Sequence, residues 1–180
     1  MNAPKMQQRQ ERKDTEAKAA AAVAAGGMIA VIRIRGTPNV EPRIKLGLAS
    51  LRLHRPNSMA LLPADNQSAR MVQRVKDYVT FGQIDEKTLI EVLGKRLETL
   101  GGHRVLEGDL KGMKVSGFSE LAAQALAGKV KFKGLGLSNV CRLHPPRKGH
   151  KRKGIKAPYS NGGALGNRGA KINELIMRMV

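Results

Sequence analysis

The chain has 180 residues, of which 33 are Lys or Arg and 14 are Asp or Glu, so its formal net charge is +19. The single Cys141 excludes an intrachain disulfide and fits a reducing cytosol, and no apolar run approaches the roughly 20 residues that a membrane-spanning helix requires. So large a positive charge favours a polyanionic partner, namely RNA, DNA or an anionic membrane surface.

Residues 1–27 form a polar and then Ala-rich leader that ends in two glycines. Residues 5–25 have high helix propensity but little apolar stripe, so we expect a helical extension and not part of the core. The leader carries three acidic residues and lacks a Leu-rich centre, which makes it a poor secretory signal.

Residues 28–84 predict a β-α-β-α-β core of the α+β class, with a three-stranded antiparallel sheet and two helices on one of its faces. The first strand is MIAVIRIR, residues 28–35. Its alternation puts Ala30, Ile32 and Ile34 on one face. The other face begins with Ile29 and Val31 and ends in two arginines, Arg33 and Arg35.

The first helix is predicted from Pro42 to about Leu53, because Ile44, Leu48 and Leu51 recur at helical spacing. Basic side chains fall outside that apolar stripe: Arg43, Lys45 and Arg52. A turn precedes the helix at residues 36–39, and a basic C-terminal cap, His54-Arg55-Pro56-Asn57, follows it. Short strands are then expected at residues 59–62 and 79–81, with a second helix capped by Asp65 or Asn66 between them.

Residues 85–180 predict a helical and basic extension. Asp85 caps a third helix with Leu89, Leu93 and Leu97 on one face, which stops at Gly101-Gly102. A weaker helix is expected at 116–127, a short strand at 129–133, and a final helix marked by Ile172, Leu175, Ile176 and Met179.

Positive charge is concentrated in this extension. Residues 121–173 contain 12 Lys or Arg and no acid, and seven of them lie between Cys141 and Lys156. Charge runs are often solvated tails, but the interspersed Gly, Pro and His favour an irregular, compact segment that follows a folded RNA surface. A membrane partner is disfavoured, because the segment lacks the apolar stripe of an interfacial helix.

Other chemistry is weakly indicated. Cys141, His144 and His150 lack the fourth ligand that a structural zinc site needs. Asp85, Glu86, Glu91 and Glu98 are interpreted as helix-start and solvated-face carboxylates. The segment GGALGNRG, residues 162–169, lacks the spacing of a phosphate-binding loop and is interpreted as turns, although its backbone amides and the following helix start would favour an anion. No metal, cofactor, small-molecule substrate or enzymatic site is therefore predicted.

Two segments resemble a known family. IRIRGTPNVEPRIKLGLASLRLHRPNSMALLP is similar to the opening of the large-subunit ribosomal protein numbered thirty in bacteria and archaea, with a eukaryotic counterpart numbered seven. The matching features are Arg35-Gly36, Leu51-Arg52-Leu53 and a short strand at 59–62. The closing GGALGNRGAKINELIMRM resembles the end of the long archaeal and eukaryotic form, and bacterial members stop after the third strand. The leader lies outside the resemblance.

The resemblance implies a ferredoxin-like core with an α-rich extension. It implies a structural role in the large ribosomal subunit, in the cytoplasm, bound to large-subunit rRNA close to the 5S RNA and to neighbouring ribosomal proteins. Position in the matched motifs and local charge together give the candidate RNA-binding residues: Arg33, Arg35, Gly36, Arg43, Lys45, Arg52, His54, Arg55, Asn57, Arg147, Lys148, His150, Lys151, Arg152, Lys153, Lys156, Asn167 and Arg168. The alternative is a free-standing architectural DNA- or RNA-binding protein, although no helix-turn-helix, zinc finger or wedge-bearing arm is recognisable.

Overall fold

The computed structural model describes residues 27–111, 117–150 and 153–180. The helix predicted for residues 5–25 lies outside these ranges. The first part of the described chain follows the predicted order: β1 (Met28–Arg33), α2 (Pro42–Ser50), β2 (Ser58–Pro63), α3 (Asn66–Arg74) and β3 (Val79–Gln83). The extension adds α4 (Glu86–Arg96), α5 (Glu107–Lys111), α6 (Phe118–Leu126), β4 (Val140–Arg142), β5 (Gly166–Asn167) and α7 (Ile172–Met177), with short 3-10 turns between them. None of the described helices is long and apolar enough to cross a membrane.

The sheet has five strands in the order β4-β2-β1-β3-β5, whereas three were predicted. The central β1 pairs antiparallel with β2 and β3, as expected. The extension then supplies both edges, with β4 antiparallel to β2 and β5 parallel to β3. The two added strands contain only three and two residues, which is too short to produce an alternating pattern.

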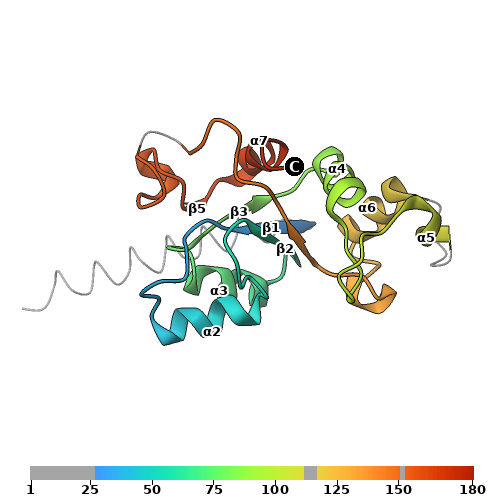
Figure 1. The fold of residues 1–180 in the computed structure, drawn as a ribbon, viewed down its shortest axis with the longest axis horizontal. Helices are drawn as coiled ribbons and strands as arrows, with labels where there is room; N and C mark the ends of the chain where they lie inside the picture. The colour runs from blue at the N-terminus through green and yellow to red at the C-terminus, as the bar shows by residue number, and fades with distance from the viewer. Residues whose placement is uncertain (1–26, 112–116, 151–152) are drawn as a thin grey trace, which may run out of the picture.

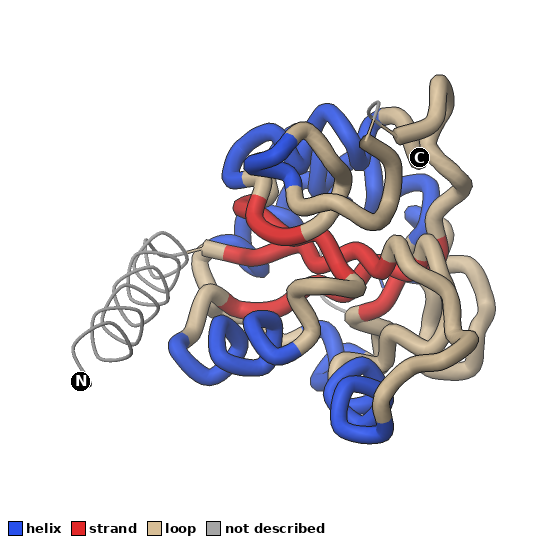
Figure 2. Tube along the Cα trace, turned by 90° about the vertical axis from the view of Figure 1, so that its left-hand side faces the viewer, coloured by secondary structure: helices blue, strands red, loops and turns tan. Residues whose placement is uncertain are grey.

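Helices cover both faces of the sheet, as Figures 1 and 2 show. On one face, Ile29 and Val31 of β1 pack with the apolar sides of α2 and α3, including Leu48 and Val72. On the other face, Ala30 and Ile32 lie in a larger cluster with α4, α6 and α7. The predicted alternation of β1 is confirmed. The prediction of helices on one face alone is incomplete, because every residue of β1 is buried and both of its faces require a cover.

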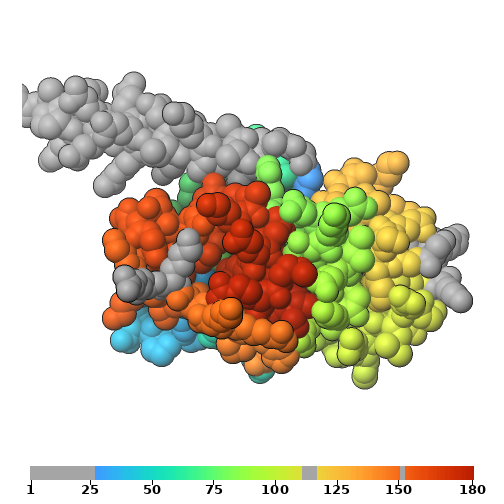
Figure 3. Space-filling model, turned by 90° about the horizontal axis from the view of Figure 1, so that it is seen from above, coloured from blue at the N-terminus to red at the C-terminus, as the bar shows by residue number. Residues whose placement is uncertain are grey.

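The larger cluster crosses the predicted boundary between residues 84 and 85. Several of its members from the extension are 0% exposed and pack against strand residues from the first half of the chain: Leu89 and Leu93 of α4, Leu121 of α6 and Ile176 of α7. Figure 3 shows α7 lying alongside α4, with the chain that follows β4 running beside them. The extension is therefore part of the hydrophobic core.

Two local predictions in the extension are wrong. The third helix ends at Arg96 and not at the glycine pair, because Leu97 is already extended, with φ −70° and ψ 131°. Residues 129–133 form no strand; Phe132 instead starts a 3-10 turn and is buried in the core. The edge of the sheet that a strand there would need is occupied by β4. The final helix is confirmed at α7.

Gly82 illustrates how closely the extension packs on the sheet. A Cβ at this position of β3 would collide with the Gly169 carbonyl oxygen and lie 3.0 Å from the Cβ of Ile172. We expect Gly82→Ala to lower the free energy of unfolding by about 1–3 kcal/mol, as overpacking does. Gly134→Ala is the control, because no atom lies within 4 Å of its Cβ position. Chemical denaturation of both variants measures the difference, and equal stabilities would contradict this packing.

Candidate nucleic-acid interface

Arg33 is a buried clamp and not a surface contact. Its side chain is only 3% exposed. Its guanidinium donates to the carbonyl oxygens of Leu53 (2.7 Å), His54 (2.9 Å), Arg35 (3.0 Å) and Gly36 (3.0 Å), and to the Thr37 hydroxyl. Burial lowers the pKa of Arg33, which the nearby Tyr78 partly opposes. The structure thus places this predicted RNA contact in the interior, with its donors directed to backbone carbonyls and the Thr37 hydroxyl.

The clamp brings two loops of the chain together at one end of the sheet. The loop that leaves β1 carries Arg35 and Gly36, and the loop that enters β2 carries His54, Arg55 and Asn57. We call this group of five residues the basic end of the sheet. The Asn57 N–H donates to the Arg33 carbonyl at 2.8 Å, and the Asn57 carbonyl accepts from Leu143 at 2.9 Å. The exposed His54 and Arg55 are thus held on an ordered turn.

Arg35 is ordered by an aromatic ring. Its guanidinium carbon lies 4.7 Å from the centre of the Tyr78 ring, and one of its nitrogens donates to the Asp77 carbonyl at 3.3 Å. Such a cation–π contact restricts the side chain while leaving its charge available. Asn57 has a left-handed backbone, with φ +61°, which Asn tolerates better than most residues. Both features fix the positions of polar groups before any ligand binds.

Arg52 occupies the residue that follows the C-cap of α2. Its φ is +57°, and the Leu53 N–H donates back to the Leu48 carbonyl at 2.9 Å, which is the Schellman arrangement. Glycine is usual there, since a left-handed backbone costs other residues about 1–2 kcal/mol. The exposed Arg52 lines a hollow of about 500 Å³ together with Lys131 and Lys133.

The two remaining basic residues of α2, Arg43 and Lys45, line different hollows of the surface. Lys45 lines a small hollow of about 90 Å³ with Arg33 and His54, so it lies beside the basic end. Arg43 is exposed and lines a different hollow with Arg74, between α2 and α3. The structure therefore does not bring all the candidates from residues 28–84 to one place.

The basic loop after β4 is anchored by Arg178. The Arg178 guanidinium donates to the Arg147 carbonyl at 2.7 and 2.9 Å and to the Gly149 carbonyl. This leaves the side chains of Arg147, Lys148, Lys153 and Lys156 exposed. Lys148 adopts a left-handed backbone, with φ +65°, in a turn closed by the Gly149 N–H and the Pro146 carbonyl. The candidates Lys151 and Arg152 lie outside the described residues.

His150 and Arg168 lie in an electropositive neighbourhood. Burial lowers the pKa of His150, and the charges of Arg168 and Arg178 lower it further. Burial also lowers the pKa of Arg168, although Tyr159 raises it and Arg178 adds to the decrease. The Arg168 guanidinium lies 4.7 Å from the centre of the Tyr159 ring. His150, Arg168 and Arg178 are thus close enough to influence one another electrostatically, and no carboxylate of the described residues contributes to the pKa shifts of His150 and Arg168.

Arg168 also ties the extension to the sheet. It donates to the Thr80 hydroxyl at 2.9 Å and to the Ala164 carbonyl at 2.9 Å. Its neighbour Asn167 is exposed, and its side-chain oxygen accepts from the Gly169 N–H at 2.8 Å. Ala164 and Leu165 pack on Ile34, immediately after β1. The segment carrying Asn167 and Arg168 therefore lies next to the basic end.

The glycines of residues 162–169 have structural explanations. Gly162, Gly166 and Gly169 have positive φ values of +83°, +82° and +54°. A Cβ on Gly163 would collide with the backbone of Ala157. The interpretation of this segment as turns fits Gly162 and Gly163, whereas Gly166–Asn167 forms the edge strand β5.

Cys141 and the carboxylates form no recognisable catalytic or metal site. Cys141 is buried in β4, where burial, and secondarily the charge of Glu98, raises its pKa to about 12. Glu91 pairs with Lys95 at 3.1 Å on the surface of α4. Glu98 lies beyond the end of that helix and not on its face. Among the described residues, no group of three or more His, Cys, Asp or Glu is placed to hold a metal ion.

Sequence reasoning missed the residues that position the cations. Tyr78 and Tyr159 stack on arginines, and Arg178 anchors the basic loop. Arg142 is exposed at the end of β4, opposite Ser58 and therefore next to Asn57. An isolated Tyr or Arg carries no sequence signal for such a role. Its partner lies 9 to 84 residues away along the chain and becomes a neighbour only in the folded protein.

The fold and this surface define a basic α+β protein that presents ordered cations from a sheet. The family model for ribosomal protein L30p/L7e matches residues 29–79. Large ribosomal subunit protein uL30 of Methanococcus maripaludis is 42% identical over 151 residues, which are 84% of this chain and 98% of that protein. The chain belongs to the ribosomal protein L30p/L7e family, which confirms the resemblance drawn from the sequence.

Two further archaeal relatives agree. Large ribosomal subunit protein uL30 of Nanoarchaeum equitans is 42% identical over 153 residues, or 85% of this chain and 99% of the relative. The protein of the same name from Thermoplasma volcanium is 43% identical over 157 residues, or 85% of this chain and 93% of the relative. The similarity therefore includes the extension as well as the core.

Proposed function

We propose that this protein is a structural constituent of the large ribosomal subunit that holds folded rRNA through phosphate and shape contacts. It acts in the cytoplasm, close to the 5S RNA and beside other ribosomal proteins. The observation that carries the proposal is the 42% identity to a large-subunit protein over 98% of that relative's length. The arrangement of cations supports the mode of binding.

The preordered cations suit a structured RNA. A-form RNA hides its base edges in a deep, narrow major groove, so a protein recognises it chiefly through phosphates, 2′-hydroxyls and shape. Rigid turns carrying Arg55 and Lys148, and arginines fixed on Tyr78 and Tyr159, match that requirement. The aromatic content is 3%, which leaves little for base stacking.

Cosedimentation tests this function against the free-standing architectural alternative. We expect the protein to remain with large subunits after a moderate salt wash and to be released only as the salt rises further. Recovery with DNA, together with release by DNase, would instead identify a chromatin-type protein. Chemical cross-linking on intact subunits then tests the proximity to 5S RNA.

Arg52 offers a variant in which RNA binding and stability separate. Arg52→Gly removes an exposed charge and relieves the left-handed backbone, at the cost of extra freedom in the unfolded chain. We expect a free energy of unfolding equal to that of the wild type or higher by up to about 1 kcal/mol. We also expect a log affinity–log salt slope for large-subunit RNA that is shallower by about one unit.

Denaturation and salt-dependent binding measure the two effects on one preparation. Lys87→Gln serves as the control, because Lys87 is exposed on the first turn of α4, away from the proposed contacts. An unchanged salt slope for Arg52→Gly would remove Arg52 from the interface.

A further inference from the structure

The end of α4 contributes to a cationic hollow. Among the described residues, none of those predicted from the sequence to bind RNA lines it. The hollow has a volume of about 210 Å³. Basic side chains from separate elements line it, with Glu98 as its one acid: Lys95, Arg96, Arg104, Arg142 and His144. Residues 98–104 reach it through a short antiparallel bridge between Glu98 and Arg104, and β4 reaches it through Arg142.

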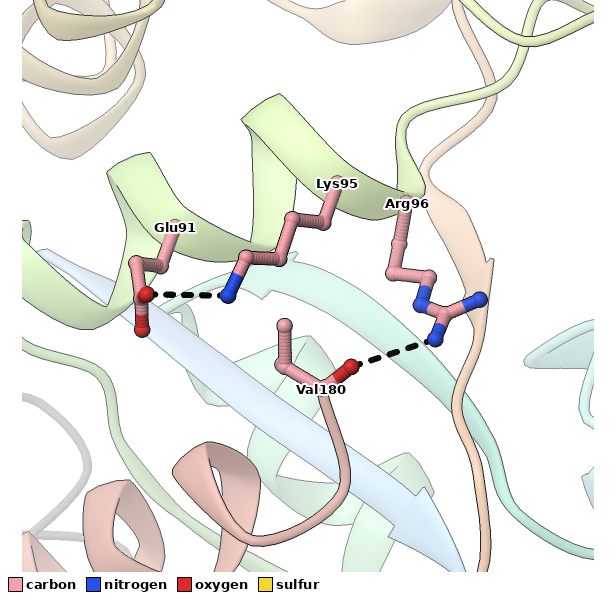
Figure 4. Close-up of polar contacts among 4 residues, drawn as sticks. All are labelled: Glu91, Lys95, Arg96 and Val180. Atoms are coloured by element: carbon pink, nitrogen blue, oxygen red, sulfur yellow. Dashed lines mark hydrogen bonds and ion pairs between the residues drawn. The ribbon is translucent and has the colours of Figure 1, made fainter.

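The charges in the hollow are largely unneutralised. Lys95 pairs with Glu91, one turn earlier in α4, at 3.1 Å (Figure 4). Within the described ranges, no Asp or Glu lies within 4.0 Å of Arg104 or Arg142, whereas Arg96 contacts a backbone oxygen of Val180, the last residue of the chain. Three guanidinium groups around one concavity make a strong site for an anion.

Arg96 is held at the edge of the hollow by the end of the chain. One of its terminal nitrogens donates to the Val180 carbonyl at 3.1 Å, which fixes the guanidinium in place, as Figure 4 shows. Its Nε is buried and has no hydrogen-bond partner within the described chain. Less than 1 Å² of that nitrogen is accessible, so an anion in the hollow would contact the terminal nitrogens of Arg96 instead.

We propose that this hollow binds a backbone phosphate of RNA, with Arg96 as the fixed donor and Arg104 and Arg142 as the closing charges. The proposal rests on the proposed function and adds a contact made by the extension. RNA is favoured over an acidic protein segment because the hollow continues the basic end of the sheet. Arg142 lies opposite Ser58, and the next residue, Leu143, donates to the Asn57 carbonyl at 2.9 Å. A strand carrying a phosphate at every nucleotide can follow such a path.

The test compares two double variants of the full chain. Arg104→Gln with Arg142→Gln removes two charges at the hollow, and both side chains are exposed, so the fold should be retained. Lys87→Gln with Lys129→Gln removes two exposed charges elsewhere. Affinity for protein-free large-subunit RNA is measured at several salt concentrations, together with the thermal midpoint of each variant.

We expect the hollow variant to have a log–log salt slope shallower than the wild type by about one to two units, and the control variant to change less. Equal slopes for the two variants at equal thermal midpoints would overturn the proposal while leaving the proposed function intact. Failure of the wild type itself to bind this RNA would overturn both. Loss of oligoglutamate binding in the hollow variant, with RNA binding unchanged, would assign the hollow to an acidic protein segment and also overturn it.

Discussion

Replacing Arg33 by Met is expected to lower the free energy of unfolding by about 3–5 kcal/mol, because it dismantles a buried, charge-assisted network. The change removes donors from five acceptors, and the bond to Leu53 lies fully inside the protein. An unpaired buried carbonyl alone costs about 1–3 kcal/mol. Arg33→Lys should also destabilise, since one ammonium cannot reproduce a planar fork that reaches both loops.

Arg55→Gln is the matched control for Arg33. Arg55 is exposed on the neighbouring loop, so its loss should change stability by no more than about 0.5 kcal/mol while weakening RNA binding. Urea denaturation and RNA affinity are measured on both variants. A stable Arg33→Met protein that had lost only RNA affinity would restore the original prediction of a direct RNA contact.

The core was predictable where a periodic pattern is long enough to be seen. β1 is apolar from Met28 to Ile32, and Ile44, Leu48 and Leu51 recur at helical spacing along and just after α2. The edge strands were not predictable, because β5 consists of Gly166 and Asn167 alone and pairs only after the extension has folded onto β3. Its position is determined by tertiary contacts such as Thr80 with Arg168 and not by local propensity.

The candidate interface shows the same division. Charge and motif selected exposed residues such as Arg55 and Lys148. Charge could not distinguish the buried Arg33 from the more exposed Arg35, two residues later. The Arg33 side chain turns inward and donates to backbone carbonyls. Arg96 gives no such signal in the sequence, because a basic residue in the last turn of a helix already complements the helix dipole.

Asn173 joins α7 to the junction between β3 and α4, so we expect its replacement to be strongly destabilising. Its side-chain oxygen accepts from the Asp85 N–H at 3.0 Å. Its amide nitrogen donates to the Gln83 and Ala170 carbonyls at 3.3 and 2.8 Å. Asn173 is only 8% exposed, and Asn173→Leu removes these three hydrogen bonds to backbone groups. We expect it to lower the free energy of unfolding by about 2–4 kcal/mol.

Asn173→Asp separates the polar contacts from side-chain volume. It keeps an acceptor for the Asp85 N–H but places a carboxylate against the Gln83 and Ala170 carbonyls, so it should destabilise as well. Glu174→Gln, the exposed neighbour, should remain within about 0.5 kcal/mol of the wild type. Ile172 and Ile176 cover the sheet beside Ala30 and Ile32, so core and extension share one cluster. We therefore expect the Asn173 variants to unfold in a single transition when denaturation is followed by circular dichroism. Two separate transitions would show that the extension is only an appendage and that the shared core does not couple it to the sheet.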